Sequence, residues 1–211
     1  MNQDGPMALF QYWNRLRGSR PAPRRSEIEP ADIKNHLPDT FIVEHEPRAE
    51  PVFRLAGTRL CAIYGRELKG HALPSLWNAR DRPAVGRLLQ HAIEAKAVAL
   101  ITFEGLSRDG RVNGFELILL PLEGGSPDGA LGLGAVQALM KPYWLGADPI
   151  VENRIESFRF IDPLHETPLA ERRPALDAPS LSPQSEVLTI RLDDGARRVR
   201  HLVVFEGGRR R

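Results

Sequence analysis

The chain has 211 residues, of which 42% are hydrophobic and 27% are charged. This composition is typical of a soluble globular protein and excludes a wholly disordered chain. No apolar run approaches the roughly 20 residues needed to cross a bilayer, so we expect no membrane span. The single cysteine, Cys61, excludes an intrachain disulfide framework. Together with the lack of a recognisable signal peptide, it predicts a cytoplasmic protein.

The net charge of +2 is unevenly distributed, because arginines gather in residues 1–25 and 191–211 while the middle of the chain is acidic. Two basic arms of this kind could bind nucleic acid or an acidic protein surface. The alternative is that they are solvated tails. We prefer the second interpretation, and expect no nucleic-acid partner, because no helix-turn-helix pattern or aromatic-interleaved basic groove accompanies the charge.

Residues 1–38 predict a helix and a connector. Pro6 suits the first turn of a helix, and apolar residues then recur at helical spacing until Gly18. This apolar face consists of Leu9, Phe10, Trp13 and Leu16. Because the face is large for so short a helix, we expect it to bury against the domain or against a second copy of the chain. The prolines of residues 18–30 indicate an extended connector.

The pattern then changes to β-rich runs at residues 40–44 and 52–55, with a proline-containing turn between them, which predicts a hairpin. A short amphipathic helix follows and ends at Gly65, since glycine enters the left-handed conformation without steric cost. A longer amphipathic helix begins at Asp81, which we expect to act as its N-cap, and runs to about Lys96.

Three further strands are predicted at residues 98–106, 112–122 and 130–140. An Asp-Gly turn links the first two and a loop rich in Gly and Pro links the last two, so all three are expected to be antiparallel neighbours. Residues 39–142 therefore predict an α+β domain, in which a five-stranded antiparallel sheet carries helices on one face. The N-terminal helix and a C-terminal extension lie outside this domain.

The pattern weakens after Pro142. Residues 155–161 could form a strand or a helix. We expect residues 143–186, with their many prolines, to be a linker and residues 187–211 to form a β-hairpin and a basic tail.

Several motifs within this order resemble the PAS (Per-Arnt-Sim) sensor domain. Residues 53–70 read FRLAGTRLCAIYGRELKG, which is similar to the PAS signature of a strand, a small helix, a glycine and Glu-Leu-x-Gly. Asp81 resembles the start of the family's Asp-initiated helix, and residues 107–111, SRDGR, resemble its Asp-Gly turn between strands. The resemblance implies the sheet described above.

The N-terminal segment resembles a narrower group of proteins within this family. Residues 9–23 read LFQYWNRLRGSRPAP and are followed by Ile28, Pro30 and the pair Leu37-Pro38. This pattern resembles stand-alone PAS proteins of alphaproteobacteria, some of which are linked to cell-cycle and stress signalling. The resemblance implies a bacterial signalling protein whose partner is a histidine kinase or another regulator, and a homodimer is expected.

PAS domains often bind a small apolar ligand between helices and sheet, and the resemblance implies such a space here. The candidate lining residues are Leu55, Leu60, Tyr64, Trp77, Leu88, Phe103, Phe115 and Leu117. The alternative, which we prefer, is that these side chains fill the space at ordinary core density. Buried Tyr64 and Trp77 need hydrogen-bond partners for their polar tips, so a ligand would leave its trace there.

The six histidines are scattered, and no pair has the spacing of a zinc site, so we expect no metal. His71 or His91 could serve as an axial ligand in a haem-binding PAS domain, although neither has a supporting motif. Phosphate-binding loops and nucleophile elbows are absent, which argues against an enzyme.

We therefore expect a non-enzymatic regulatory module that binds a signalling protein, or itself, through the Leu9, Phe10, Trp13 and Leu16 face and the outer sheet face, with a bound metabolite as a modulator. The alternatives are a DNA-associated regulator that uses the basic termini, and a haem or flavin sensor.

Overall fold

The computed structural model describes residues 5–46, 49–124, 130–161, 196–199 and 202–205. The chain divides into two units, Met1–Arg172 and Arg173–Arg211. The second unit contains the antiparallel pair β7 (Ala196–Val199) and β8 (Leu202–Phe205). This pair overlaps the predicted C-terminal hairpin, whereas its predicted first strand, residues 187–192, and most of the basic tail lie outside the described residues.

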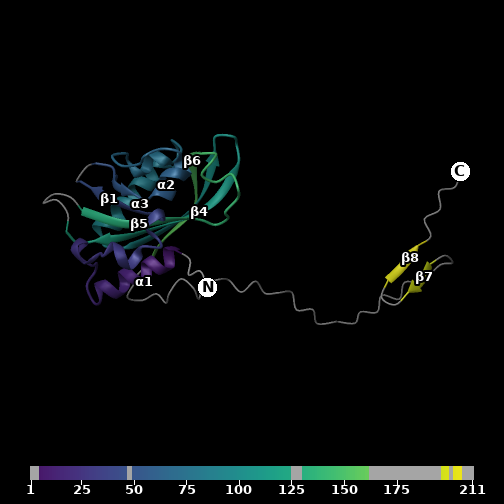
Figure 1. The fold of residues 1–211 in the computed structure, drawn as a ribbon, viewed down its shortest axis with the longest axis horizontal. Coiled ribbons are helices and arrows are strands. Elements are labelled where there is room, and N and C mark those ends of the chain that lie inside the picture. Colours follow the sequence, from purple (N-terminus) through teal and green to yellow (C-terminus); the bar gives the residue numbers. More distant parts are fainter. Residues whose placement is uncertain (1–4, 47–48, 125–129, 162–195, 200–201, 206–211) are drawn as a thin grey trace. The chain divides into compact units, whose positions relative to one another are not determined.

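The first unit is built on a six-stranded antiparallel sheet with the order β2-β1-β5-β4-β3-β6 (Figure 1). Its strands are β1 (Thr40–His45), β2 (Val52–Ala56), β3 (Val98–Ser107), β4 (Val112–Leu122), β5 (Ala130–Ala138) and β6 (Ile150–Ile161). Strand β1 pairs with β5, so the first hairpin joins the last three predicted strands in one sheet, as the α+β prediction requires.

The sheet has one strand more than the five predicted, because β6 pairs with β3 along the edge. Twelve residues inside the predicted linker 143–186 therefore belong to the sheet. The sequence pattern concealed this strand for a physical reason. Two irregularities in the β3–β6 pairing, and exposed residues such as Val151 and Phe158 on an edge strand, remove the regular alternation of buried and exposed positions that signals a strand.

Helices α2 (Thr58–Tyr64) and α3 (Arg82–Glu94) and the short 3-10 turn η4 (Leu73–Leu76) pack on one face of the sheet. Helix α2 ends at Gly65, which has a φ of 61° and adopts the predicted left-handed C-cap. Asp81 occupies the predicted N-cap position of α3, but its side chain forms no capping hydrogen bond; its carboxylate instead accepts hydrogen bonds from Asn78 and from the backbone of Ile155 in β6.

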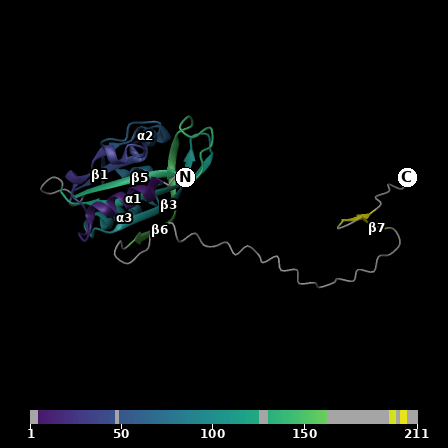
Figure 2. The ribbon, with the colours of Figure 1, turned by 60° about the horizontal axis from the view of Figure 1, so that its bottom comes forward.

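Helix α1 (Gly5–Arg17) covers the opposite face of the sheet, together with a connector containing the 3-10 turns η1 (Arg25–Glu27), η2 (Pro30–Ile33) and η3 (Leu37–Asp39). Figure 2 shows α1 in front of the sheet when the lower side of Figure 1 comes forward. The sheet thus separates two apolar clusters, one under α2 and α3 and one under α1. None of the described helices is long and apolar enough to span a bilayer.

Candidate functional site

Most of the residues predicted to line the space between the helices and the sheet are buried in the core there. Six of the eight candidates are buried in one cluster: Leu60, Tyr64, Trp77, Phe103, Phe115 and Leu117. The Trp77 and Phe103 rings have centroids 5.3 Å apart, and Phe103 stacks on Phe115 at the same separation. Gly105 permits this packing, because a Cβ at that position would lie 2.6 Å from a ring carbon of Phe115.

The other two candidates do not join this cluster. Leu55 is 49% exposed, because a bulge pairs Ile42 with Leu55 and Val43 with Phe53, which interrupts the alternation along β2 and turns Leu55 outward. Leu88 is only partly buried on α3, whose buried face contains the adjacent Leu89.

Three buried polar groups lie within this region. The Tyr64 hydroxyl accepts a hydrogen bond of 2.8 Å from the side-chain amide of Asn153, a fully buried residue of β6. Burial raises the pKa of Tyr64 above its ordinary value. The indole nitrogen of Trp77 and the side-chain oxygen of Asn153 have no hydrogen-bond partner among the described residues. Sequence reasoning identified Tyr64 and Trp77 but missed Asn153, because β6 itself was not recognised.

The histidines considered as axial ligands lie elsewhere. His71 and His91 are both exposed, and the His91 ring contacts Phe160 edge-on with centroids 5.0 Å apart. Neither side chain belongs to the buried cluster, so the geometry does not fit a haem held there by either residue. Within the described residues, no three His, Cys, Asp or Glu side chains group as metal ligands.

The predicted partner-binding face of α1 is buried in its own chain. Leu9, Phe10 and Trp13 are buried against the sheet and Leu16 packs beside them. The Trp13 indole nitrogen donates a hydrogen bond of 2.7 Å to the Pro121 carbonyl oxygen. This face and the outer sheet face beneath it cover each other in the folded chain, which is burial against the domain, one of the two arrangements expected from the sequence.

A sequence model of the PAS domain matches residues 1–137. The chain belongs to the PAS domain family. The match includes α1 and the connector, so the segment on the outer face belongs to the family pattern. Strand β6 lies beyond the matched residues.

Several solved structures are similar to this PAS protein. One, from a flavin-analogue study of the mechanism of a Light-Oxygen-Voltage domain, has 14% identity and a TM-score of 0.40, and the match covers 54% of this chain and 85% of that one. A PAS domain from Colwellia psychrerythraea has 16% identity, a TM-score of 0.39 and coverage of 54% and 100%. A fungal Light-Oxygen-Voltage photoreceptor has 14% identity, a TM-score of 0.39 and coverage of 55% and 94%. No curated protein matches the chain.

Exposed apolar residues occur at the start of β4 and in the residues that follow β5. Four large apolar residues form what we call the Met140 surface: Val112, Leu139, Met140 and Tyr143. Leu139 lies against Gly114, with its backbone nitrogen bonded to the Gly114 carbonyl, and Val112 shares that face of β4. Asn113 donates to the Met140 carbonyl oxygen, which fixes the backbone there. The sequence pattern did not predict this surface.

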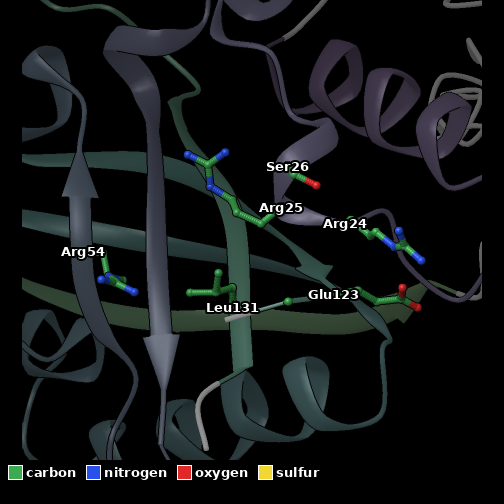
Figure 3. Close-up of a pocket in the computed structure, with 7 residues that line it drawn as sticks. Arg24, Arg25, Ser26, Arg54, Glu123 and Leu131 are labelled. Atoms are coloured by element: carbon green, nitrogen blue, oxygen red, sulfur yellow. The ribbon is translucent and has the colours of Figure 1, made fainter. Parts of the chain in front are cut away.

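A second surface feature is a shallow pocket of about 630 Å³ near the start of β5. Figure 3 shows Arg54 of β2 on one side of Leu131 and Arg24 of the connector on the other, with Glu123 near Arg24. Arg54 already forms an ion pair with Glu44.

The N-terminal basic residues are less available than a free arm would be. Arg17 is buried, with hydrogen bonds to Asn14 and to the Arg20 carbonyl, and Arg20 forms a two-pronged ion pair with Glu27. These contacts weigh against the interpretation of residues 1–25 as a DNA-binding arm.

Proposed function

We propose that this PAS domain protein is a non-enzymatic signalling module that acts by binding another signalling protein through the Met140 surface. The observation that carries the proposal is the exposure of Met140 and Tyr143, which are 69% and 92% accessible. Large apolar side chains exposed together mark interaction sites, and aromatic and Met residues are enriched in interfaces. The resemblance noted from the N-terminal segment favours a histidine kinase or another regulator as the partner, with a homodimer as the alternative.

The position of the Met140 surface supports this role. It lies where the chain leaves β5, and its backbone is tied to β4 through Asn113 and Gly114. A change in the packing of the sheet would therefore alter the geometry of the surface. Helix α1 packs on one face of the sheet and helices α2 and α3 pack on the other.

Site-specific crosslinking in the native cell tests this proposal. The photoreactive residue p-benzoylphenylalanine replaces Tyr143 or, as the control, the exposed Leu55 of β2. We expect a distinct crosslinked signalling protein, or a second copy of the chain, from position 143 only. With the purified partner, Met140→Ser and Tyr143→Ser should each weaken binding about tenfold or more, and Leu55→Ser should change it less than twofold. Equal crosslinking at both positions, or unchanged affinities, would contradict the proposal.

A small ligand that modulates this binding is a second candidate function. The observation that favours it is the pair of unpartnered buried atoms, Trp77 Nε1 and Asn153 Oδ1, beside a core otherwise filled by side chains. Buried polar atoms normally have a partner, which here would be water or a polar group of a ligand. Mass spectrometry of small molecules released on denaturation tests for a ligand, and the absorption spectrum of the purified protein distinguishes a haem or flavin sensor from a colourless one.

A further inference from the structure

A second pocket, of about 440 Å³, borders the helix–sheet core and shares no lining residue with the pocket of Figure 3. It forms where the end of α2, the turn η4 and the β3–β4 turn meet the first residues of β6. Its walls include Tyr64, Arg66, Ser75, Arg108 and Ile150. Residues 149–151 lie beyond the part of the chain that the PAS domain pattern matches, so the pocket depends on this chain's own extension.

The backbone around the pocket is fixed by close contacts. Gly65 has no side chain, and a Cβ there would lie 2.6 Å from Cγ of Pro149. The backbone nitrogen of Arg108 donates a hydrogen bond of 2.9 Å to the Pro149 carbonyl oxygen. The next residue, Asp109, donates its backbone N–H to the carboxylate of Asp148. The turn that carries Arg108 is therefore held against the segment that leads into β6.

The charge of the pocket is positive. Arg66 and Arg108 line it and no acidic residue does. Among the described residues, neither arginine forms an ion pair, whereas other exposed arginines, such as Arg59 and Arg154, pair with carboxylates. Two unneutralised guanidinium groups on one pocket raise the local concentration of anions and offer planar donor forks that match phosphate and carboxylate groups.

We propose that this pocket binds a small anionic metabolite through a phosphate or carboxylate group held by Arg66 and Arg108. The volume falls within the range of small-molecule sites, about 300–1,000 Å³. Ser75 and Tyr64 also line the pocket and would border the remainder of the ligand. The site does not depend on the partner surface around Met140, and either proposal stands if the other fails.

Titration of the full chain followed by amide NMR tests the site. The probes are inorganic phosphate and succinate at neutral pH, each against sodium chloride of equal ionic strength. We expect saturable shifts of the amides of Arg66, Arg108 and Val151 with at least one probe and none with chloride. Saturation with phosphate alone identifies a phosphate ligand, and saturation with succinate alone identifies a carboxylate ligand.

Matched variants locate the binding. Arg66→Ala and Arg108→Ala should each lower the affinity for the saturating probe about tenfold or more, because each removes a charge-assisted hydrogen bond. Arg87→Ala, at an exposed position of α3, and Arg25→Ala, in the pocket of Figure 3, should leave the affinity within twofold. The side chains of Arg66 and Arg108 are both exposed to solvent, so the Arg66→Ala and Arg108→Ala variants should keep the wild-type spectrum away from the pocket.

Three outcomes would overturn the proposal. Shifts that rise linearly without saturation for both probes would show only general ionic effects. Saturable shifts confined to residues near Arg24 and Arg25 would move the site to the other pocket. Equal weakening in all four variants would show that net charge, and not these two side chains, governs the affinity.

Discussion

The side-chain amide of Asn153 donates a hydrogen bond of 2.8 Å to the hydroxyl of Tyr64, and both residues are buried. Tyr64 ends α2 in the PAS signature segment, and Asn153 lies in β6, 89 positions later. The bond therefore joins the helical layer to the strand that extends the sheet. The Tyr64 hydroxyl, one of the two buried polar groups expected from the sequence to need a partner, thus finds that partner within the protein itself.

Tyr64→Phe should destabilise the domain by about 1–3 kcal/mol, because it leaves the buried amide of Asn153 without its partner. Urea denaturation measures the change. Tyr143→Phe, at a 92% exposed tyrosine, is the matched control and should shift stability by less than about 0.5 kcal/mol. If the two variants lose equal stability, the hydrogen bond contributes nothing measurable.

The stability of the domain should fall as the pH rises above 10. Burial raises the pKa of Tyr64 above its ordinary value of 10.0, so the folded state keeps a proton that the unfolded chain loses. The unfolded state is then favoured by up to about 1.4 kcal/mol per pH unit above 10. Below pH 10 the stability contributed by the protonated Tyr64 hydroxyl is fully present. Urea denaturation from pH 9 to pH 11 should show a smaller decline in Tyr64→Phe than in the wild type, and parallel declines would contradict the assignment.

Trp13→Ala should destabilise the domain by about 3–5 kcal/mol. The indole is fully buried between α1 and the sheet, and its loss leaves a cavity and an unpaired Pro121 carbonyl oxygen. Gln11→Ala, on the exposed side of the same helix, controls for helix propensity and should be nearly neutral. Denaturation midpoints report both changes, and a small loss in Trp13→Ala would mean that α1 is not docked in solution.

Removal of residues 1–20 should expose the apolar outer face of the sheet, which includes Ile118, Leu120 and Leu133. We expect self-association or loss of folding, which light scattering and circular dichroism distinguish. A folded monomer after truncation would show that α1 does not protect this face.

Two glycine substitutions should act in opposite directions. Gly134→Ala places a Cβ 2.2 Å from the Phe41 ring and 2.7 Å from the Ile118 carbonyl oxygen, so we expect a loss of about 1–3 kcal/mol from overpacking. Gly86→Ala lies inside α3, where the nearest atom is 3.7 Å away, and should gain about 0.5–1 kcal/mol of helix stability. Thermal melting compares them directly, and the same sign for both would be evidence against the packing of β5 on β1.

The local parts of the fold were predictable because they follow from residues close in the chain. The spacing of Leu9, Phe10 and Trp13 predicted α1, and Gly65 marked the end of α2. Of the candidate lining residues, Phe103, Phe115 and Leu117 are buried where the strand period holds, whereas Leu55 is exposed where a bulge interrupts that period. A bulge leaves no distinct pattern in five residues of an edge strand.

The sequence by itself determined the family, the first five strands and the helices that cover them, since hydrophobic periodicity, glycine caps and turn residues act over short distances. Only the tertiary structure decided where α1 docks, that β6 completes the sheet, and that Asn153 meets Tyr64. Each of these depends on pairing between distant segments, which is set by the burial of whole faces and by the register of an edge strand. The same distant pairing brings Arg66 and Arg108 to one pocket.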